Sequence, residues 1–164
     1  MTEAEKRLHR CALAGHRPEK IALTEEEAKA WLSGQIDTAI SAGFTTFITG
    51  CGMGVDLWAA QLVIGKRATN PAIRLIAAPP YPGFHRRWKE DWRAVYEEVI
   101  SGADLVRPVC PHYEDDSFRK RGEWMVRHSS LLIALYSGEE GSTRAMVDLA
   151  RQENIRVIER IAGK

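Results

Sequence analysis

The segment Gly50-Cys51-Gly52-Met53-Gly54 carries three glycines in alternation. Glycine lets backbone N–H groups approach an anion closely, and a helix that begins there adds about half a positive charge at its N-terminus. The segment is therefore suited to binding phosphate. Its spacing differs from the dinucleotide-binding pattern G-x-G-x-x-G, and no P-loop Lys-Ser/Thr pair follows, which disfavours a standard dinucleotide or kinase site. The simpler alternative is that the glycines only form a tight turn.

A second glycine-containing loop begins at Gly138 and continues through Gly141 to Ser142 and Thr143. It follows an apolar segment and precedes one with helical spacing, so it offers backbone donors and two hydroxyl groups. Two such loops at one edge of a sheet indicate a phosphate site more specifically than either loop alone.

Three other positions could contact the same ligand. Gly15-His16-Arg17 supplies a guanidinium suited to bidentate phosphate contact. His16 is either a ligand contact or an ordinary loop histidine that caps the backbone. Asp56 could hydrogen-bond a ribose hydroxyl or hold a magnesium ion that accompanies a nucleotide, or it could only compensate a helix dipole.

The segment from Pro79 to His85 combines prolines with aromatic residues. Tyr81 and Phe84, together with Trp88, could stack on a nucleobase, although aromatic residues at this density more often belong to a core or an interface. The histidine and acidic residues between 112 and 116 lack the spacing of metal ligands on a helix, so no protein metal site is predicted.

Alternating strands and helices must position these residues. Apolar or β-branched segments predict strands at 10–15, 45–49, 73–78, 104–106, 131–136 and 155–158. Helical spacing predicts helices after Thr24 and after Gly54, and over 86–100, 117–129 and 142–152. Thr24 stands three residues before Glu27, which is the pattern of a capping box. This alternation predicts one α/β domain over residues 1–164, with three α/β/α layers and a mostly parallel sheet of about six strands.

Right-handed crossovers place every strand-to-helix loop of such a sheet at one edge. The loops 15–20, 50–54, 79–85, 108–116 and 137–142 should therefore lie close together. Ligands of open α/β sheets bind at this carboxyl edge. The candidate residues are thus expected to form one site.

Composition limits the class of protein. A chain of 164 residues with a net charge of +1 fits one domain and argues against a general nucleic-acid coat. No apolar run or signal-peptide core predicts a membrane segment. Cys11, Cys51 and Cys110 are odd in number and far apart, which disfavours a disulfide framework or a structural zinc site. A soluble protein of the reducing cytoplasm is expected.

The segments 14–18, 49–60 and 124–126 resemble the YpsA-like branch of the SLOG superfamily, which includes the DNA-processing protein Smf/DprA and the Lonely Guy proteins. The resemblance implies a Rossmann-like domain that binds a nucleotide or a nucleotide-derived ligand, often as a homodimer. Lonely Guy proteins carry an arginine four residues before a methionine, and Arg121 precedes Met125 by four. The predicted ligand-binding residues are Gly15, His16, Arg17, Gly50, Cys51, Gly52, Met53, Gly54, Asp56, Pro79, Tyr81, Arg121, Gly138, Gly141, Ser142 and Thr143.

Lonely Guy enzymes hydrolyse a nucleoside monophosphate, and their loop is followed by a glutamate where this chain has Ala145. Alanine supplies no carboxylate to stabilise developing charge or position water. Gly122 and Ser142 also depart from the related patterns. No catalytic residue is therefore assigned.

The main hypothesis is a protein that binds or senses a nucleotide or an ADP-ribose-like molecule. The first alternative is a glycosidic hydrolase that uses Asp56 or Glu123. The second is a DprA-like binder of single-stranded DNA, which the near-neutral charge disfavours, with a basic rim formed by Arg86, Arg87, Lys89, Arg93, Arg119, Lys120, Arg121 and Arg127. The last hypothesis is a scaffold that binds a partner protein, with Trp88 and Trp92 side by side on one helix as part of the interface. The same pair could instead form the interface of a homodimer.

Overall fold

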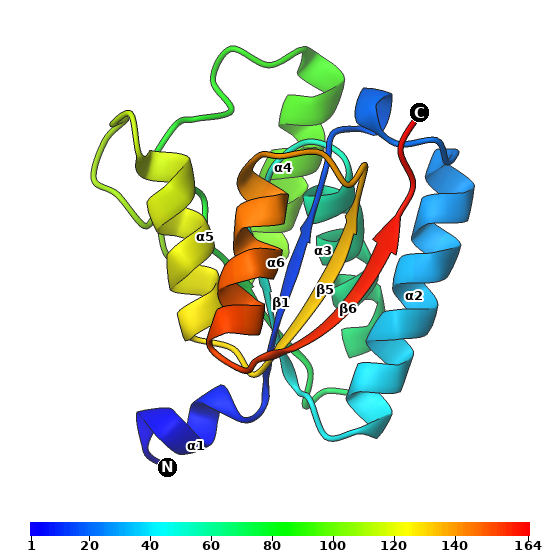
Figure 1. The fold of residues 1–164 in the computed structure, drawn as a ribbon, viewed down its shortest axis with the longest axis vertical. Coiled ribbons are helices and arrows are strands. Elements are labelled where there is room, and N and C mark those ends of the chain that lie inside the picture. Colours follow the sequence, from blue (N-terminus) through cyan, green and yellow to red (C-terminus); the bar gives the residue numbers. More distant parts are fainter.

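One six-stranded sheet with the order β4-β3-β2-β1-β5-β6 forms the centre of the computed structural model, which describes residues 1–164 (Figure 1). Its strands are β1 (Arg10–Gly15), β2 (Thr46–Thr49), β3 (Arg74–Ala77), β4 (Leu105–Val106), β5 (Leu131–Tyr136) and β6 (Arg156–Ile161). Every neighbouring pair is parallel. The predicted α/β class and parallel sheet are confirmed.

Helices cover both faces of the sheet. They are α1 (Glu3–Arg7), α2 (Glu25–Ser41), α3 (Val55–Arg67), α4 (Glu90–Gly102), α5 (Ser117–Arg127) and α6 (Ser142–Gln152), with a short 3-10 turn at Pro18–Lys20. Helices α2, α3 and α4 pack on one face, and α5 and α6 pack on the other (Figure 1). The fold is therefore the expected three-layer, Rossmann-like sandwich.

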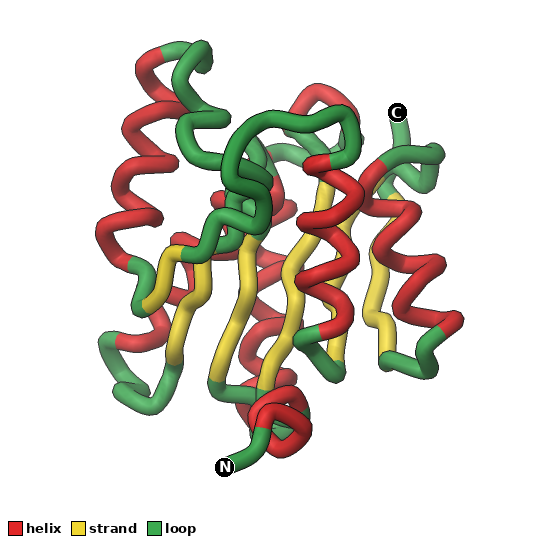
Figure 2. The backbone as a smooth tube through the Cα atoms, turned by 90° about the vertical axis from the view of Figure 1, so that its left-hand side faces the viewer, coloured by secondary structure: helices red, strands yellow, loops and turns green.

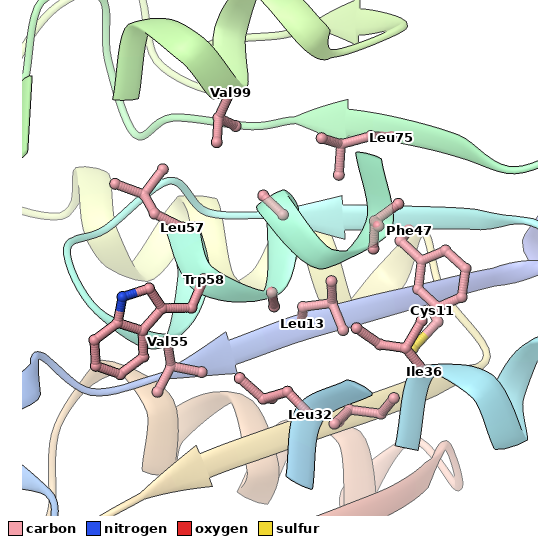
Figure 3. Packing of buried hydrophobic residues seen from close by; sticks show 14 of the residues in the cluster. Cys11, Leu13, Leu32, Ile36, Phe47, Val55, Leu57, Trp58, Leu75 and Val99 are labelled. Atoms are coloured by element: carbon pink, nitrogen blue, oxygen red, sulfur yellow. The ribbon is translucent and has the colours of Figure 1, made fainter. Parts of the chain in front are cut away.

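Successive residues of β1 point into two different cores. Cys11 and Leu13 join the larger apolar cluster under α2, α3 and α4, as Figure 3 shows. Ala12 and Ala14 join the smaller cluster under α5 and α6. Strands that are buried on both faces need a continuous apolar sequence rather than an alternating one. This explains why the central strands read as unbroken apolar runs.

The capping box predicted at the start of α2 is present. The Thr24 hydroxyl accepts a hydrogen bond from the Glu27 N–H, and the Glu27 carboxylate accepts one from the Thr24 N–H, both at 3.1 Å. Together they satisfy two backbone donors that the first turn of a helix leaves free. The helix ends two residues before Gly43, which has a φ of 101°.

The bounds of α4 and β6 differ most from the sequence predictions, and the short helix α1 was not predicted. Helix α4 was expected from Arg86 but begins at Glu90, because the preceding residues form turns that pack Phe84 and Trp88 against Tyr96. Strand β6 runs to Ile161 instead of residue 158, because it pairs along the whole of β5. Contacts distant in sequence decided both boundaries.

The strand order reverses between β1 and β5. From β1 the chain adds strands towards β4, and it then crosses back to place β5 and β6 on the other side of β1. The crossover loops on the two sides diverge at such a point, and the crevice that results is where open α/β sheets bind ligands. The larger loops gather at this carboxyl edge (Figure 2).

None of the helices has both the length and the apolar composition needed to cross a membrane. The three cysteines, Cys11, Cys51 and Cys110, are all buried and free. Burial raises the pKa of the Cys11 and Cys51 thiols above its ordinary value.

Candidate functional site

A cavity of about 340 Å³ opens at the carboxyl edge of the sheet, above β1 and beside the start of α6. This volume falls within the range of small-molecule pockets. Its lining includes the predicted residues Gly15, His16, Arg17, Gly52, Met53, Asp56, Tyr81, Arg121, Gly141, Ser142 and Thr143. The predicted residues Gly50, Cys51, Gly54, Pro79 and Gly138 do not line it. The topology thus brings four of the five predicted loops and α5 to one cavity.

Arg121 is a buried cation in the wall of this cavity. Its side chain is on α5, and the residue is only 6% exposed. One guanidinium nitrogen, Nη1, donates to the Gly50 carbonyl oxygen, while Nε has no hydrogen-bond partner. The guanidinium also lies 5.7 Å from the centre of the Phe118 ring, within cation–π range. Arg121 forms no ion pair within 4.0 Å, and the Asp56 carboxyl group is near enough to interact with its charge at longer range.

Gly50 contributes to the site indirectly. A Cβ atom at this position would lie 2.4 Å from Nη1 of Arg121, which is closer than packed atoms approach. The absence of a side chain at Gly50 therefore makes room for the guanidinium. The close approach of the Arg121 side chain is thus a structural reason for glycine at this position.

The N-terminus of α6 points a second positive group at the cavity. Gly141 is the N-cap residue and provides no side-chain cap, and the first intrahelical hydrogen bond of the turn runs from Ala145 N–H to the Gly141 carbonyl. The amides of Ser142 and Thr143 therefore have no intrahelical acceptor. The helix dipole adds partial positive charge at this end. The second glycine loop has the free donors that phosphate binding requires.

The first glycine loop, in contrast, uses several of its amides inside the protein. The Cys51 N–H donates to the Thr49 hydroxyl, and the Gly52 N–H donates to Asp56 Oδ2 at 3.0 Å. The Val55 N–H, at the start of α3, donates to the His16 carbonyl at 3.3 Å. These contacts favour the tight-turn reading for much of the loop, and phosphate contact by Gly52 and Met53 stays a prediction.

Asp56 joins the end of β1 to the first glycine loop. Its Oδ1 accepts from the Gly15 N–H at 3.1 Å, while Oδ2 accepts from Gly52, and the residue is 6% exposed. Burial raises the pKa of this carboxyl group to about 6, and the nearby Arg121 opposes the rise. Asp56 therefore has a structural role as well as a place in the cavity wall.

His16 connects the carboxyl ends of β1 and β5. Its Nδ1 accepts a hydrogen bond from the Ser137 N–H at 3.1 Å, so the proton of the neutral ring lies on Nε2. Burial, and then the charge of Lys20, lowers the pKa of the ring below its ordinary value. His16 thus caps the backbone and also lines the cavity, and a contact with a ligand stays a prediction.

Aromatic side chains form one wall of the cavity. Tyr81 lies edge-to-face with Phe84 and Phe118, at 5.8 and 6.3 Å between ring centres. Trp88 packs on Phe84 at 5.0 Å, while Trp92 packs on Trp58 of α3 at 6.1 Å. Trp88 and Trp92 therefore contact the chain's own core, and a homodimer built on them stays a prediction.

Several cavity residues were not found from the sequence. Lys20, Phe118 and Met146 line the cavity, as do Met125 and Glu140. Phe118 and Met125 stand three residues before and four residues after Arg121, so helical spacing would have placed them on the same face of α5. Lys20 and Glu140 belong to the predicted edge loops 15–20 and 137–142, whereas Met146 had no signal in the sequence alone.

The two acids considered for hydrolysis lie in different places. Asp56 lines the cavity, but Glu123 lies outside it and pairs with Arg119 at 2.7 Å. No group of three or more histidine, cysteine or acidic side chains is arranged to hold a metal ion.

Comparison with known proteins agrees with this architecture. A sequence profile of the family described as the YspA SLOG family (YpsA) matches residues 11–160. A UPF0398 protein of Bacillus cereus (strain G9842) is 27% identical over 151 residues, which cover 87% of this chain and 82% of that protein. A UPF0398 protein of Halalkalibacterium halodurans is 30% identical over 121 residues, covering 72% and 64% of the two chains.

Two solved structures share the fold. DNA processing protein A from Helicobacter pylori, described for its single-stranded DNA binding mode, superposes with a TM-score of 0.62 at 15% identity and covers 96% of this chain. DNA processing protein A (DprA) from Streptococcus pneumoniae gives a TM-score of 0.62 at 14% identity and covers 93%. This chain spans 66% and 50% of those two proteins.

Proposed function

We propose, from the premise that the chain belongs to the YspA SLOG family, that it binds or senses a nucleotide or a nucleotide derivative. In this proposal the phosphate of the ligand lies at the N-terminus of α6, within reach of Arg121. The sugar and the base extend across the cavity towards the aromatic wall of Tyr81, Phe84 and Phe118.

The state of Arg121 is the observation that supports the proposal. Burial of a charge is costly unless close partners satisfy it, and an anion that binds beside Arg121 would add such a partner. The guanidinium has an unused Nε donor, and the amides of Ser142 and Thr143 have no intrahelical acceptor. A phosphate would satisfy these groups together, through hydrogen bonds that are strengthened by charge.

The rest of the cavity suits a larger anionic ligand. Arg17 and Lys20 also line it, and neither forms an ion pair within the chain. Glu140 and Asp56 are the acids in the lining, and they could accept hydrogen bonds from ligand hydroxyls. Aromatic faces and edges are the usual surfaces on which a nucleobase packs.

Thermal unfolding in the presence of nucleoside mono-, di- and triphosphates, NAD and ADP-ribose tests the proposal. A ligand at a hundred times its Kd stabilises the folded state by about 2.7 kcal/mol. The assay is run with and without magnesium, which tests whether the ion accompanies the ligand. If none of these compounds changes the unfolding temperature, the proposal is wrong.

Two substitutions on α5 test whether the ligand binds beside Arg121. Arg121→Gln should weaken the affinity for any stabilising ligand by about tenfold or more, because it removes a charged hydrogen bond to phosphate. Arg127→Gln is the matched control, because Arg127 lies at the exposed end of the same helix and pairs with Glu123 and Glu153. Equal affinities of the two variants would place the ligand elsewhere.

Hydrolysis of the bound nucleotide is the second candidate. Asp56 favours it, because an acid whose pKa is raised to about 6 and which lines a cavity has the properties of a general acid. Chromatography of the incubated ligand would detect a released base. Wild-type turnover that Asp56→Asn abolishes, with binding retained, would assign the reaction to this carboxyl group.

Fewer basic residues are available to bind single-stranded DNA than the sequence suggested. Arg119, Lys120 and Arg127 are engaged in ion pairs with acidic neighbours, and Arg121 is buried. Arg86, Arg87, Lys89 and Arg93 remain free of ion pairs. Affinity for an oligonucleotide that falls steeply with salt, and falls further on substitution of these four, would establish this function.

A further inference from the structure

A second cavity of about 380 Å³ lies between α5 and α6, on the side away from the sheet. Gly122 and Ala145 leave its floor free of long side chains, and Phe118, Met146 and Leu149 form apolar walls. A Cβ atom at Gly122 would lie 2.8 Å from Cγ of Met146, so the glycine allows the two helices to pack closely beneath it. We call this cavity the α5–α6 groove.

The charged residues at the rim of the groove are already paired. Arg119 donates to Glu123 at 2.7 Å and to Asp116 at 3.1 Å, so its guanidinium is held by two carboxylates. Glu123 is likewise occupied by Arg119. The groove therefore presents apolar surface without a free charge, and an uncharged apolar group is the occupant that fits it.

The groove adjoins the cavity at the sheet edge. Four residues, Phe118, Gly141, Ser142 and Met146, line both spaces. The first-turn amides of α6 therefore lie at the boundary between them. A phosphate held by these amides can carry one substituent in each space.

We propose that the α5–α6 groove binds an apolar group attached to the far side of the ligand's phosphate. This inference rests on the proposed function, and it identifies the ligand as a phosphodiester or a substituted diphosphate rather than a simple nucleoside monophosphate. The nucleoside lies against the aromatic wall, the phosphate lies at the N-terminus of α6, and the apolar group lies over Gly122 and Ala145.

Methyl phosphate and phenyl phosphate test the groove without any assumption about the base. Both carry the same phosphate, and only the second carries a group large enough to fill apolar space. Phenyl phosphate should bind about tenfold more tightly, as measured by chemical-shift titration, because the ring is removed from water. This difference is the quantity that the variants should change.

Ala145→Leu should abolish the difference between the two probes and leave the affinity for methyl phosphate unchanged, since leucine fills the groove but not the anion site. Ala145 is exposed on α6 and leucine is a good helix former, so the variant is expected to fold normally. Ala30→Leu, at an exposed position of α2, is the matched control and should preserve the difference.

Other outcomes overturn the inference. If the difference persists in Ala145→Leu and is lost in Tyr81→Ala, the ring binds the aromatic wall instead. If Ala145→Leu changes the oligomeric state but not the affinities, the groove is an interface between copies of the chain. If nucleotides bind but the two probes bind equally, the groove inference fails alone; if no phosphate compound binds, the proposed function fails with it.

Discussion

Replacement of Asp56 by asparagine should change how stability depends on pH. In the folded protein both carboxylate oxygens accept backbone N–H groups, and burial raises the pKa from an ordinary value of 3.8 to about 6. A rise of about two pKa units, at about 1.4 kcal/mol each, corresponds to about 3 kcal/mol. The folded state binds the proton more tightly than the unfolded state does, so this stabilisation is present at low pH and is lost as the pH rises through 6.

Asparagine has nearly the same shape as aspartate but does not titrate. Its side-chain oxygen can still accept from Gly15 or Gly52, but its amide nitrogen cannot accept from the other. We therefore expect a constant penalty for the lost hydrogen bond at every pH. In addition to this constant difference, the free energy of unfolding of the wild-type protein should fall by about 2.5 kcal/mol relative to that of Asp56→Asn between pH 4 and pH 7.5.

Urea unfolding of both proteins at several pH values in this range measures the difference directly. Histidines such as His16 and His85 titrate in both proteins, so their contributions cancel in the comparison. Equal denaturant slopes would show that the two proteins expose the same surface on unfolding. A stability difference that stays constant within about 0.5 kcal/mol across the range would refute the argument, because Asp56 would then ionise at its ordinary pKa.

Two further substitutions test the elements around the site. Gly15→Ala would place a Cβ atom 2.3 Å from the Leu135 carbonyl oxygen and 2.4 Å from Cγ1 of Val55, so we expect a loss of about 3 kcal/mol or more in urea unfolding. Gly34→Ala on α2 is its control, because nothing lies within 4 Å there and the helix should gain up to about 1 kcal/mol. Thr24→Ala removes the capping box and should cost about 1 kcal/mol, seen as a lower thermal midpoint; an unchanged midpoint would contradict the importance of the cap.

Local sequence signals predicted most of the fold. Strand β1 was expected at the residues where it occurs, because an apolar run ends at Gly15. The start of α2 followed from Thr24 and Glu27, whose side chains act within one turn. The start of α4 was missed, because Phe84 and Trp88 pack on Tyr96 and hold the preceding residues in turns. That contact depends on the tertiary fold, which outweighs local helical spacing.

The site could be predicted in position but not in detail. The parallel topology was enough to bring Arg17, Asp56 and Thr143 to one cavity from segments far apart in the sequence. Which amides remain free was not predictable, because the Gly52 N–H is used locally by Asp56 and the Val55 N–H is used by the His16 carbonyl, which is distant in sequence. The unpaired state of Arg121 likewise emerges only when α5 packs over Gly50.

Alkylation of the buried cysteines can report which part of the protein opens. Cys11 lies in the middle of the sheet, so an alkylating reagent reaches it only when the larger core opens. Cys110 is 4% exposed and its N–H bonds to the Pro80 carbonyl, which ties together two loops at the carboxyl edge. Its rate of alkylation therefore follows the separation of those two loops, and comparison with Cys11 distinguishes this local opening from unfolding of the whole protein.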